Sequence, residues 1–164
     1  MLIVSDTTPI ISLMKINRLY LLEELFQKVW IPKSVYKELT ENDSFPEEAE
    51  QIRRSGFIYV AEAENRILVN KLLNENGLDL GESEAIALAC DLEADLLLVD
   101  EKRARRIAKQ MDIPKTGTVG ILLQAFDEQL LSTEEMEVCV SLLKQENIRL
   151  SKAVCDYVYE HMKK

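Results

Sequence analysis

Short apolar runs alternate with amphipathic stretches along almost the whole chain. The apolar runs predict strands, and the stretches between them have the 3.6-residue period of helices. The clearest run is Asp95–Val99, whose Leu-Leu-Leu-Val is typical of a parallel strand buried on both faces. Regular alternation of strands and helices predicts an α/β fold, with a parallel sheet covered by helices on both sides.

Start and stop signals set the expected element boundaries. The expected strands are Leu2–Ser5, Val29–Ile31, Phe57–Val60, Asp95–Val99 and Lys115–Thr116. The first expected helix starts at Thr8-Pro9. The others cover about 19–26, 32–39, 46–55, 63–76, 84–92 (continuing from residues 79–82), 101–111, 119–130, 133–147 and 151–162. Thr8 is the expected N-cap of the first helix, with Pro9 at its first position. Asp79 and Glu82 have the spacing of a capping box.

Length and composition bound the kind of protein. A chain of 164 residues with 47% hydrophobic content suits one domain with a substantial core. No repeat or linker divides it, so we expect a single domain over 1–164, with a core over about 1–130 and C-terminal helices over about 131–164. The strand at Leu2 leaves no room for a signal peptide, and no apolar stretch is long enough to span a membrane. Cys90, Cys139 and Cys155 are expected as buried thiols of a cytoplasmic protein.

Several classes of catalytic site are disfavoured. His161 is the only histidine, so a multi-histidine zinc site cannot form and a Ser-His-Asp triad is disfavoured. Walker A and Gly-X-Gly-X-X-Gly motifs are absent. A haloacid-dehalogenase-type hydrolase needs aspartate where Thr8 stands, and a receiver domain needs Lys-Pro where Pro114-Lys115 stands. Any enzyme chemistry would therefore come mainly from carboxylates, lysine, hydroxyls or thiols.

Two predicted strands end in an aspartate, Asp6 and Asp100. In a parallel sheet both side chains lie at the carboxyl edge, where ligands of such folds bind. Each aspartate could instead cap the helix that follows, although Thr8 and Pro9 weaken that alternative for Asp6. Glu38 lies at the flank of the buried face of its helix, and Glu84 leads into an alanine-rich packed face; either could also be a solvated charge.

Four carboxylates in one crevice would raise one another's pKa values unless a cation neutralised them. Oxygen ligands alone suit Mg²⁺ or Mn²⁺. Such ions can ionise an attacking water and stabilise charge on a phosphodiester as its bond breaks. The net charge of −9 by itself speaks against a nucleic-acid partner, but a carboxylate site contributes to that balance and local charge can override it.

The chain resembles the PIN-domain superfamily over about residues 1–130, and within it an uncharacterised bacterial and archaeal subgroup. The segments that carry the resemblance are Val4–Leu13, Ile31–Leu39, Gly81–Ala89 and Leu97–Glu101. The resemblance implies a three-layer α/β/α fold with a central, mainly parallel sheet of about five strands. It also implies Mg²⁺- or Mn²⁺-dependent cleavage of RNA, often by the toxin of a toxin–antitoxin pair.

Carried over by position, the acidic quartet and the metal ligands are Asp6, Glu38, Glu84 and Asp100, with Thr7 in a supporting place. Glu82 is expected in the capping box, also in support. The chain has Thr8 where many PIN nucleases have asparagine, and Glu84 where many have aspartate. A catalytically silent PIN-like binding or regulatory module is the alternative from a different functional class.

A basic stripe follows Asp100. Lys102, Arg105, Arg106 and Lys109 share one helix face, and Arg103 lies close to the site in sequence. The stripe can hold the phosphates of an RNA substrate, or it can be the solvated face of an amphipathic helix. The final helices are expected to pack on the core or form a lid; a homodimer or antitoxin surface is the other option.

Overall fold

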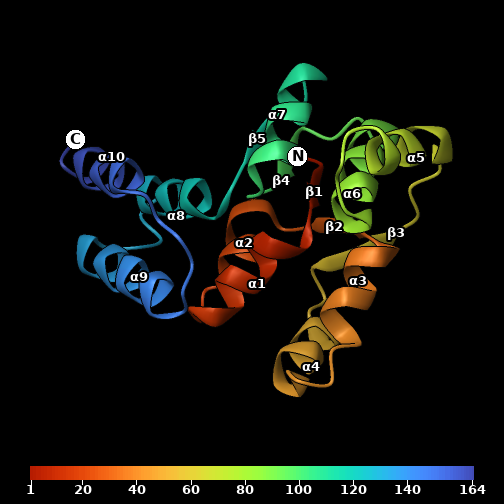
Figure 1. Cartoon of the computed structure of the whole chain (residues 1–164). Helices are drawn as coiled ribbons and strands as arrows, with labels where there is room; N and C mark the ends of the chain where they lie inside the picture. The colour runs from red at the N-terminus through yellow and green to blue at the C-terminus, as the bar shows by residue number, and fades with distance from the viewer.

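The computed structural model describes residues 1–164, with five parallel strands between two layers of helices (Figure 1). The strands are β1 (Ile3–Ser5), β2 (Val29–Pro32), β3 (Ile58–Ala61), β4 (Leu96–Leu98) and β5 (Lys115–Thr116). Their order in the sheet is β3-β2-β1-β4-β5. The chain therefore builds outward from β1 to one edge and then crosses back to β4. The predicted α/β class and the number of strands are confirmed.

Ten helices connect and cover the strands. They are α1 (Thr7–Lys15), α2 (Tyr20–Phe26), α3 (Lys33–Thr40), α4 (Pro46–Arg54), α5 (Arg66–Asn74), α6 (Leu80–Asp91), α7 (Lys102–Gln110), α8 (Thr118–Asp127), α9 (Thr133–Gln145) and α10 (Lys152–Met162). None of them combines the length and the apolar character needed to cross a membrane.

The side chains of the strands divide the core into two halves. Ile3 and Leu98 belong to a cluster with α1, α2, α8 and α9 on one face of the sheet. Val4 and Leu97 belong to a second cluster, with α5, α6 and α7 on the other face. Because successive side chains of a strand point to opposite faces, both faces are apolar and both need a helical cover. This produces the three-layer α/β/α arrangement.

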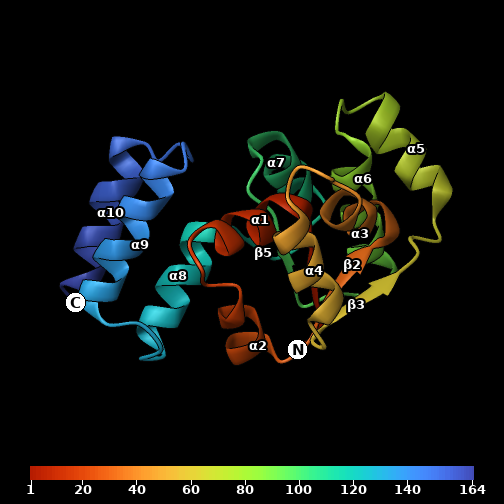
Figure 2. The ribbon, with the colours of Figure 1, turned by 90° about the horizontal axis from the view of Figure 1, so that it is seen from below.

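The last two helices extend one of these layers. In both views α8, α9 and α10 lie together at one end of the molecule (Figures 1 and 2). Met136, Val140 and Leu143 of α9 are buried in the same cluster as α1 and α2. The expected packing of this region on the core is confirmed, and it also brings α10 against α8.

Two expected helix starts are wrong. The first helix begins at Thr7 and not after Thr8, because Asp6 has the extended backbone of an N-cap residue. Pro9 is the third residue of this helix, and it is tolerated there because the backbone N–H groups of the first turn have no intrahelical acceptor. The fifth helix begins at Arg66 and not near Ala63, because the side chain of Asn65 accepts from the N–H of Leu68 and caps it there.

All three cysteines are free thiols, as expected. Only Cys139 is fully buried, however, and Cys90 and Cys155 are half-buried. The apolar helical pattern around the two half-buried residues therefore predicted more burial than these helices provide.

The packing of α6 on the sheet predicts a large difference between two isoleucines. Ile86 of α6 is fully buried, whereas Ile67 of α5 is 85% exposed. We expect Ile86→Ala to lower the free energy of unfolding by about 2–5 kcal/mol, through lost burial and the cavity left behind. Ile67→Ala should change it by less than about 0.5 kcal/mol. Urea denaturation of both variants checks this, and similar losses would mean that α6 does not pack as described.

Candidate functional site

Asp6 and Asp100 lie at the same edge of the sheet. Asp6 follows β1 directly, and Asp100 stands two residues beyond β4, its parallel neighbour in the register Ser5↔Leu98. The N–H of Asp6 donates to the carbonyl oxygen of Leu98 at 2.9 Å. The strand order reverses between β1 and β4, so both aspartates lie at the topological switch point, where open α/β sheets bind their ligands.

Asp6 is a buried carboxyl group with acidic neighbours. Its residue is 3% exposed, and its side chain makes no capping hydrogen bond to α1. Burial raises the pKa of Asp6 to about 7; a hydrogen bond from the Thr7 backbone opposes this rise, and the negative charges of Asp79, Glu82 and Glu38 add to it. No lysine, arginine or histidine forms an ion pair with Asp6. Ionising this group is therefore costly unless a cation arrives.

The first turn of α6 brings two of these negative charges to Asp6. Asp79 and Glu82 form the expected capping box: Asp79 Oδ1 accepts from Glu82 N–H at 2.7 Å, and Glu82 Oε1 accepts from Asp79 N–H at 2.9 Å. A side chain at Gly81 would contact Asp6 Oδ1 and Asp79 Oδ1, at 3.5 and 3.6 Å. Burial raises the pKa of Glu82, and the negative charges of Asp79 and Glu101 raise it further. Glu82 is thus both a cap and a neighbour of Asp6.

Glu38 reaches this group from α3. The Thr7 hydroxyl donates to Glu38 Oε2 at 2.7 Å, which ties the exposed Glu38 side chain to the start of α1. Its negative charge raises the pKa of Asp6, so the two carboxylates are close enough to repel. Thr7, expected in a supporting role, thus holds the carboxylate of Glu38 by a hydrogen bond.

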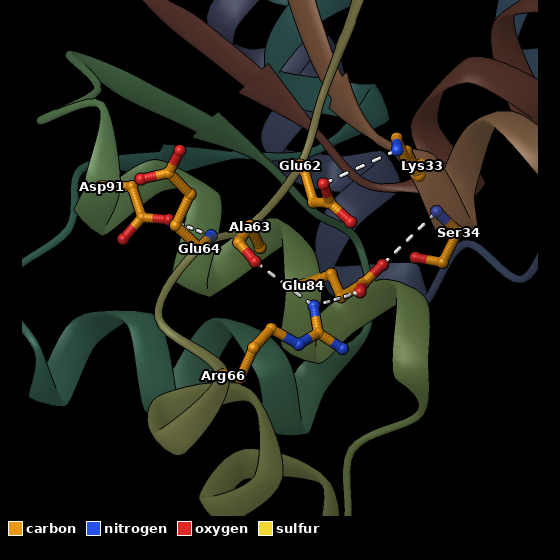
Figure 3. A network of polar contacts seen from close by, with 8 residues as sticks. All are labelled: Lys33, Ser34, Glu62, Ala63, Glu64, Arg66, Glu84 and Asp91. Atoms are coloured by element: carbon orange, nitrogen blue, oxygen red, sulfur yellow. Dashed lines mark hydrogen bonds and ion pairs between the residues drawn. The ribbon is translucent and has the colours of Figure 1, made fainter.

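Glu84 has a different environment from Asp6 (Figure 3). It is also buried, but Arg66 Nη1 contacts Glu84 Oε2 at 2.6 Å and the Ser34 N–H donates to Oε1 at 3.3 Å. Burial acts to raise the pKa of Glu84, but the hydrogen bonds from Ser34 and Arg66 and the Arg66 charge outweigh it and lower this pKa. Arg66 Nη1 also donates to the carbonyl of Ala63. An internal cation therefore already neutralises Glu84, and the network ties α6 to α3 and α5.

Asp100 is held by the start of α8. Its Oδ1 accepts from the Thr118 N–H at 2.7 Å, and its Oδ2 accepts from the Thr118 hydroxyl at 2.6 Å. A Cβ at Gly117 would collide with Asp100 Oδ1, so glycine is required for this approach. The alternative that Asp100 caps the next helix is wrong, since Glu101 accepts from the Ala104 N–H and caps α7.

The basic stripe on α7 is mostly exposed. Ala104, Ile107 and Ala108 are buried on the opposite face, which confirms the amphipathic pattern. Lys102, Arg106 and Lys109 are exposed and make no ion pair. Arg105 is half-buried and donates to the carbonyl of Val99 at 3.1 Å, which places its guanidinium beside Asp100. Arg103 donates to the carbonyl of Gly77, away from the stripe.

The donor chemistry around Asp6 fits a hard divalent cation. Asp6, Glu38, Asp79 and Glu82 provide only oxygen atoms, and none of them has a basic partner. No three acidic, histidine or cysteine side chains already lie close enough together to hold an ion. Binding one would therefore require side chains to turn toward Asp6. The structure does not bring Glu84 into this group, and it adds Asp79 and Glu82.

Asp79 and Glu82, which the sequence did not place beside Asp6, carry a recognisable sequence motif. The spacing of Asp79 and Glu82 indicated a capping box, and a cap is by definition at the end of a helix. In this fold that helix end points at the carboxyl edge of β1. The local function of Glu82 as a cap hid its position beside Asp6.

A family model described as a PIN domain matches residues 2–164, which is nearly the whole chain. The curated proteins contain no match to this chain.

The raised pKa of Asp6 predicts an unusual pH dependence of stability. Because the pKa is about 7 in the folded protein and 3.8 ordinarily, the folded state binds the proton more tightly. In the absence of metal, stability should therefore fall as pH rises between these values, by roughly 4 kcal/mol from this residue. We expect Asp6→Asn to match the wild type near about pH 4 and to be several kcal/mol more stable near about pH 8.

Urea denaturation in a chelating buffer at the two pH values makes this measurement. Asn replaces the neutral carboxyl group with little change in shape, so the comparison isolates the ionisation. A variant that gains no stability at the higher pH would show that Asp6 ionises without cost.

The Arg66–Glu84 pair should behave in the opposite way. The pKa of Glu84 is lowered in the folded protein, so the pair stabilises the fold at pH values above the ordinary pKa of 4.5. This contribution is lost as the pH falls through the lowered pKa. Arg66→Gln leaves a buried carboxylate without its cation. We expect a loss of about 1–3 kcal/mol at neutral pH, less than for a fully buried pair because the Arg66 side chain is 49% exposed.

Arg54→Gln is the matched control for this loss. Arg54 pairs with Glu50 at 2.8 Å, but its side chain is 80% exposed, so its loss should cost less than about 0.5 kcal/mol. Denaturation at neutral and acidic pH compares the two. Equal effects, or a loss at Arg66 that does not shrink as the pH falls, would contradict the role given to this pair.

Proposed function

Because the chain belongs to the PIN-domain family, whose members are generally nucleases, we propose that it is a divalent-metal-dependent ribonuclease. Its substrate is RNA, and its reaction is hydrolysis of a phosphodiester bond. Mg²⁺ or Mn²⁺ is the proposed cofactor, in keeping with a donor set made only of oxygen atoms. The observation that carries the proposal is the buried carboxyl group of Asp6, which has three acidic neighbours and no basic partner.

Asp6 is the centre of the proposed site. It is buried, has no basic partner, and has three further carboxylates near enough to raise its pKa. A structural carboxylate would be paired, as Glu84 is with Arg66. Perturbed acidic groups at a ligand-binding edge are typical of functional sites.

The proposed ligand set begins with the quartet Asp6, Glu38, Glu84 and Asp100. The surroundings support Asp6 and Glu38 directly, because the two repel and Thr7 holds the second in place. They support Glu82 better than Glu84 as the contribution of α6, because Glu82 acts on Asp6 and Glu84 is already neutralised. We therefore propose Glu82 as an alternative to Glu84 for the metal ligand that α6 contributes.

A bound cation would supply an ionised water and would stabilise the charge that develops on the phosphodiester. The residues of the chain prepare the site. Thr118 fixes the orientation of Asp100 with two hydrogen bonds. Arg105 stands beside Asp100 and can hold a phosphate of the strand next to the scissile bond. The exposed stripe of Lys102, Arg106 and Lys109 extends this basic surface along α7.

A catalytically silent PIN-like module, which binds or regulates without cleaving, is the second candidate. The specific observation in its favour is that no three acidic side chains are already gathered at coordination distance. Metal binding separates the two candidates, because a silent module needs no cation at Asp6. The toxin role in a toxin–antitoxin pair, with a small antitoxin protein or a second copy of the chain as partner, belongs to the ribonuclease proposal.

Cleavage and metal binding should fail together in Asp6→Asn. We expect the wild type to cut RNA with Mg²⁺ or Mn²⁺ and to stop in a chelating buffer. Asp6→Asn should lower the rate by at least about a hundredfold, since even residues that support metal ligands are worth 10–100-fold. Mn²⁺ should raise the thermal unfolding midpoint of the wild type and leave that of Asp6→Asn unchanged.

Glu82→Gln and Glu84→Gln identify the ligand from α6. Glutamine keeps the capping box at position 82, so a loss there reports the carboxylate charge and not the cap. If Mn²⁺ no longer raises the thermal unfolding midpoint of Glu82→Gln but still raises that of Glu84→Gln, the ligand from α6 is Glu82. Undiminished cleavage by Asp6→Asn would refute the assigned site altogether.

A further inference from the structure

A cleft of about 590 Å³ extends from Asp100 to the C-terminal helices. Its walls come from the carboxyl edge of β5, from α8, from the segment that joins α9 to α10, and from α10 itself. α10 lies beside α8 in both views (Figures 1 and 2), and this packing forms the outer wall. The cleft therefore includes Asp100 of the candidate site and is completed by the last 20 or so residues of the chain.

The charge inside the cleft differs from that of the whole protein. Apart from His161, its charged residues are Asp100, Arg105 and Arg149. Arg149 is exposed and makes no ion pair, and Arg105 bonds only to a backbone carbonyl. In a chain with a net charge of −9, the lining of the cleft thus has two arginines against one carboxylate, and Asp100 lies beside Arg105. The unpaired Arg149 favours an anion that enters from the side of α10.

The cleft also offers an apolar wall and an exposed aromatic ring. Leu123 of α8 and Val154 of α10 line it, together with Tyr157, which is 62% exposed. The Tyr157 ring packs on the His161 ring, with centroids 6.1 Å apart. His161 in turn bonds Asp127 of α8 at 2.8 Å. These contacts hold an exposed aromatic side chain in place in the same cleft as the unpaired guanidinium group of Arg149.

We propose that this cleft binds an unpaired nucleotide of a single-stranded RNA, with the base against Tyr157 and the apolar wall and a phosphate at Arg149. The inference rests on the proposed ribonuclease function and adds a nucleotide-binding subsite built by the C-terminal helices. Basic groups that follow the backbone, combined with aromatic rings that stack on bases, are the chemistry of single-strand binding. A base in a double helix is already paired and stacked, and its entry would cost a few kcal/mol. The cleft thus selects single strands.

Fluorescence anisotropy with an end-labelled RNA tests the proposal without relying on cleavage. The full chain is titrated in a chelating buffer against a single strand and against its duplex, and a gel verifies that the RNA stays intact. We expect the wild type to bind the single strand at least about tenfold more tightly. Tyr157→Ser and Arg149→Gln should each raise the Kd for the single strand by about fivefold or more.

Matched controls lie on α9 and α10, outside the cleft. Tyr159→Ser removes an exposed tyrosine from α10, and Lys144→Gln removes a positive charge from α9. Both should change the Kd by less than about twofold. Salt dependence separates the two contributions. Arg149→Gln should reduce the slope of log K against log salt by about 0.7, and Tyr157→Ser should leave the slope unchanged.

Two results would overturn this inference. One is an equal effect of the cleft variants and their controls, and the other is duplex binding as tight as single-strand binding. Cleavage by the wild type in either case would leave the ribonuclease proposal intact. Conversely, single-strand binding through Tyr157 without any metal-dependent cleavage would retain the cleft and remove the hydrolytic function.

Discussion

The buried carboxyl group of Asp6 is the constraint on which the rest of the site depends. It lies at the end of a central strand, away from water, with three other carboxylates around it and no basic side chain against it. Such an arrangement stores unfavourable electrostatic free energy, because each ionised neighbour makes ionisation of Asp6 harder. In the proposed site, a divalent cation would make these interactions favourable, because the carboxylates that repel one another would each attract the cation.

The topology explains why this charge gathers where it does. Starting the sheet in its middle, with β1 between β2 and β4, puts the carboxyl end of β1 at the topological switch point. The first turn of α6 lies beside it, since a Cβ at Gly81 would be in ordinary van der Waals contact with Asp6 Oδ1. Its capping residues Asp79 and Glu82 therefore have two physical roles. They satisfy the helix end, and they contribute negative charge to the site.

Glu84 is a second buried carboxylate, but it has a basic partner. Only two residues from Glu82 along α6, it points to a different side and meets Arg66 and Ser34. The pKa shifts of the two glutamates have opposite directions for this reason. Burial alone does not distinguish the environments of Asp6 and Glu84; the presence of a basic partner does. On the far side of Asp100, the packing of α10 against α8 forms a cleft whose lining includes Arg149 and Tyr157.

The sequence by itself determined the architecture and the strand-end acids. The uninterrupted apolar run around Leu97 required cover on both faces, and the positions of Asp6 and Asp100 after parallel strands placed them at one edge. These conclusions depend on local patterns, which a single sequence displays directly. Only the tertiary structure decided which other side chains face Asp6. Glu82 and Glu84 have the same chemistry and nearly the same position in the sequence, and their difference arises from the partners that packing brings to each. Arg66 and Thr118 are 18 residues away in sequence from the carboxylates they bind, Glu84 and Asp100 respectively, and no periodic pattern connects such pairs.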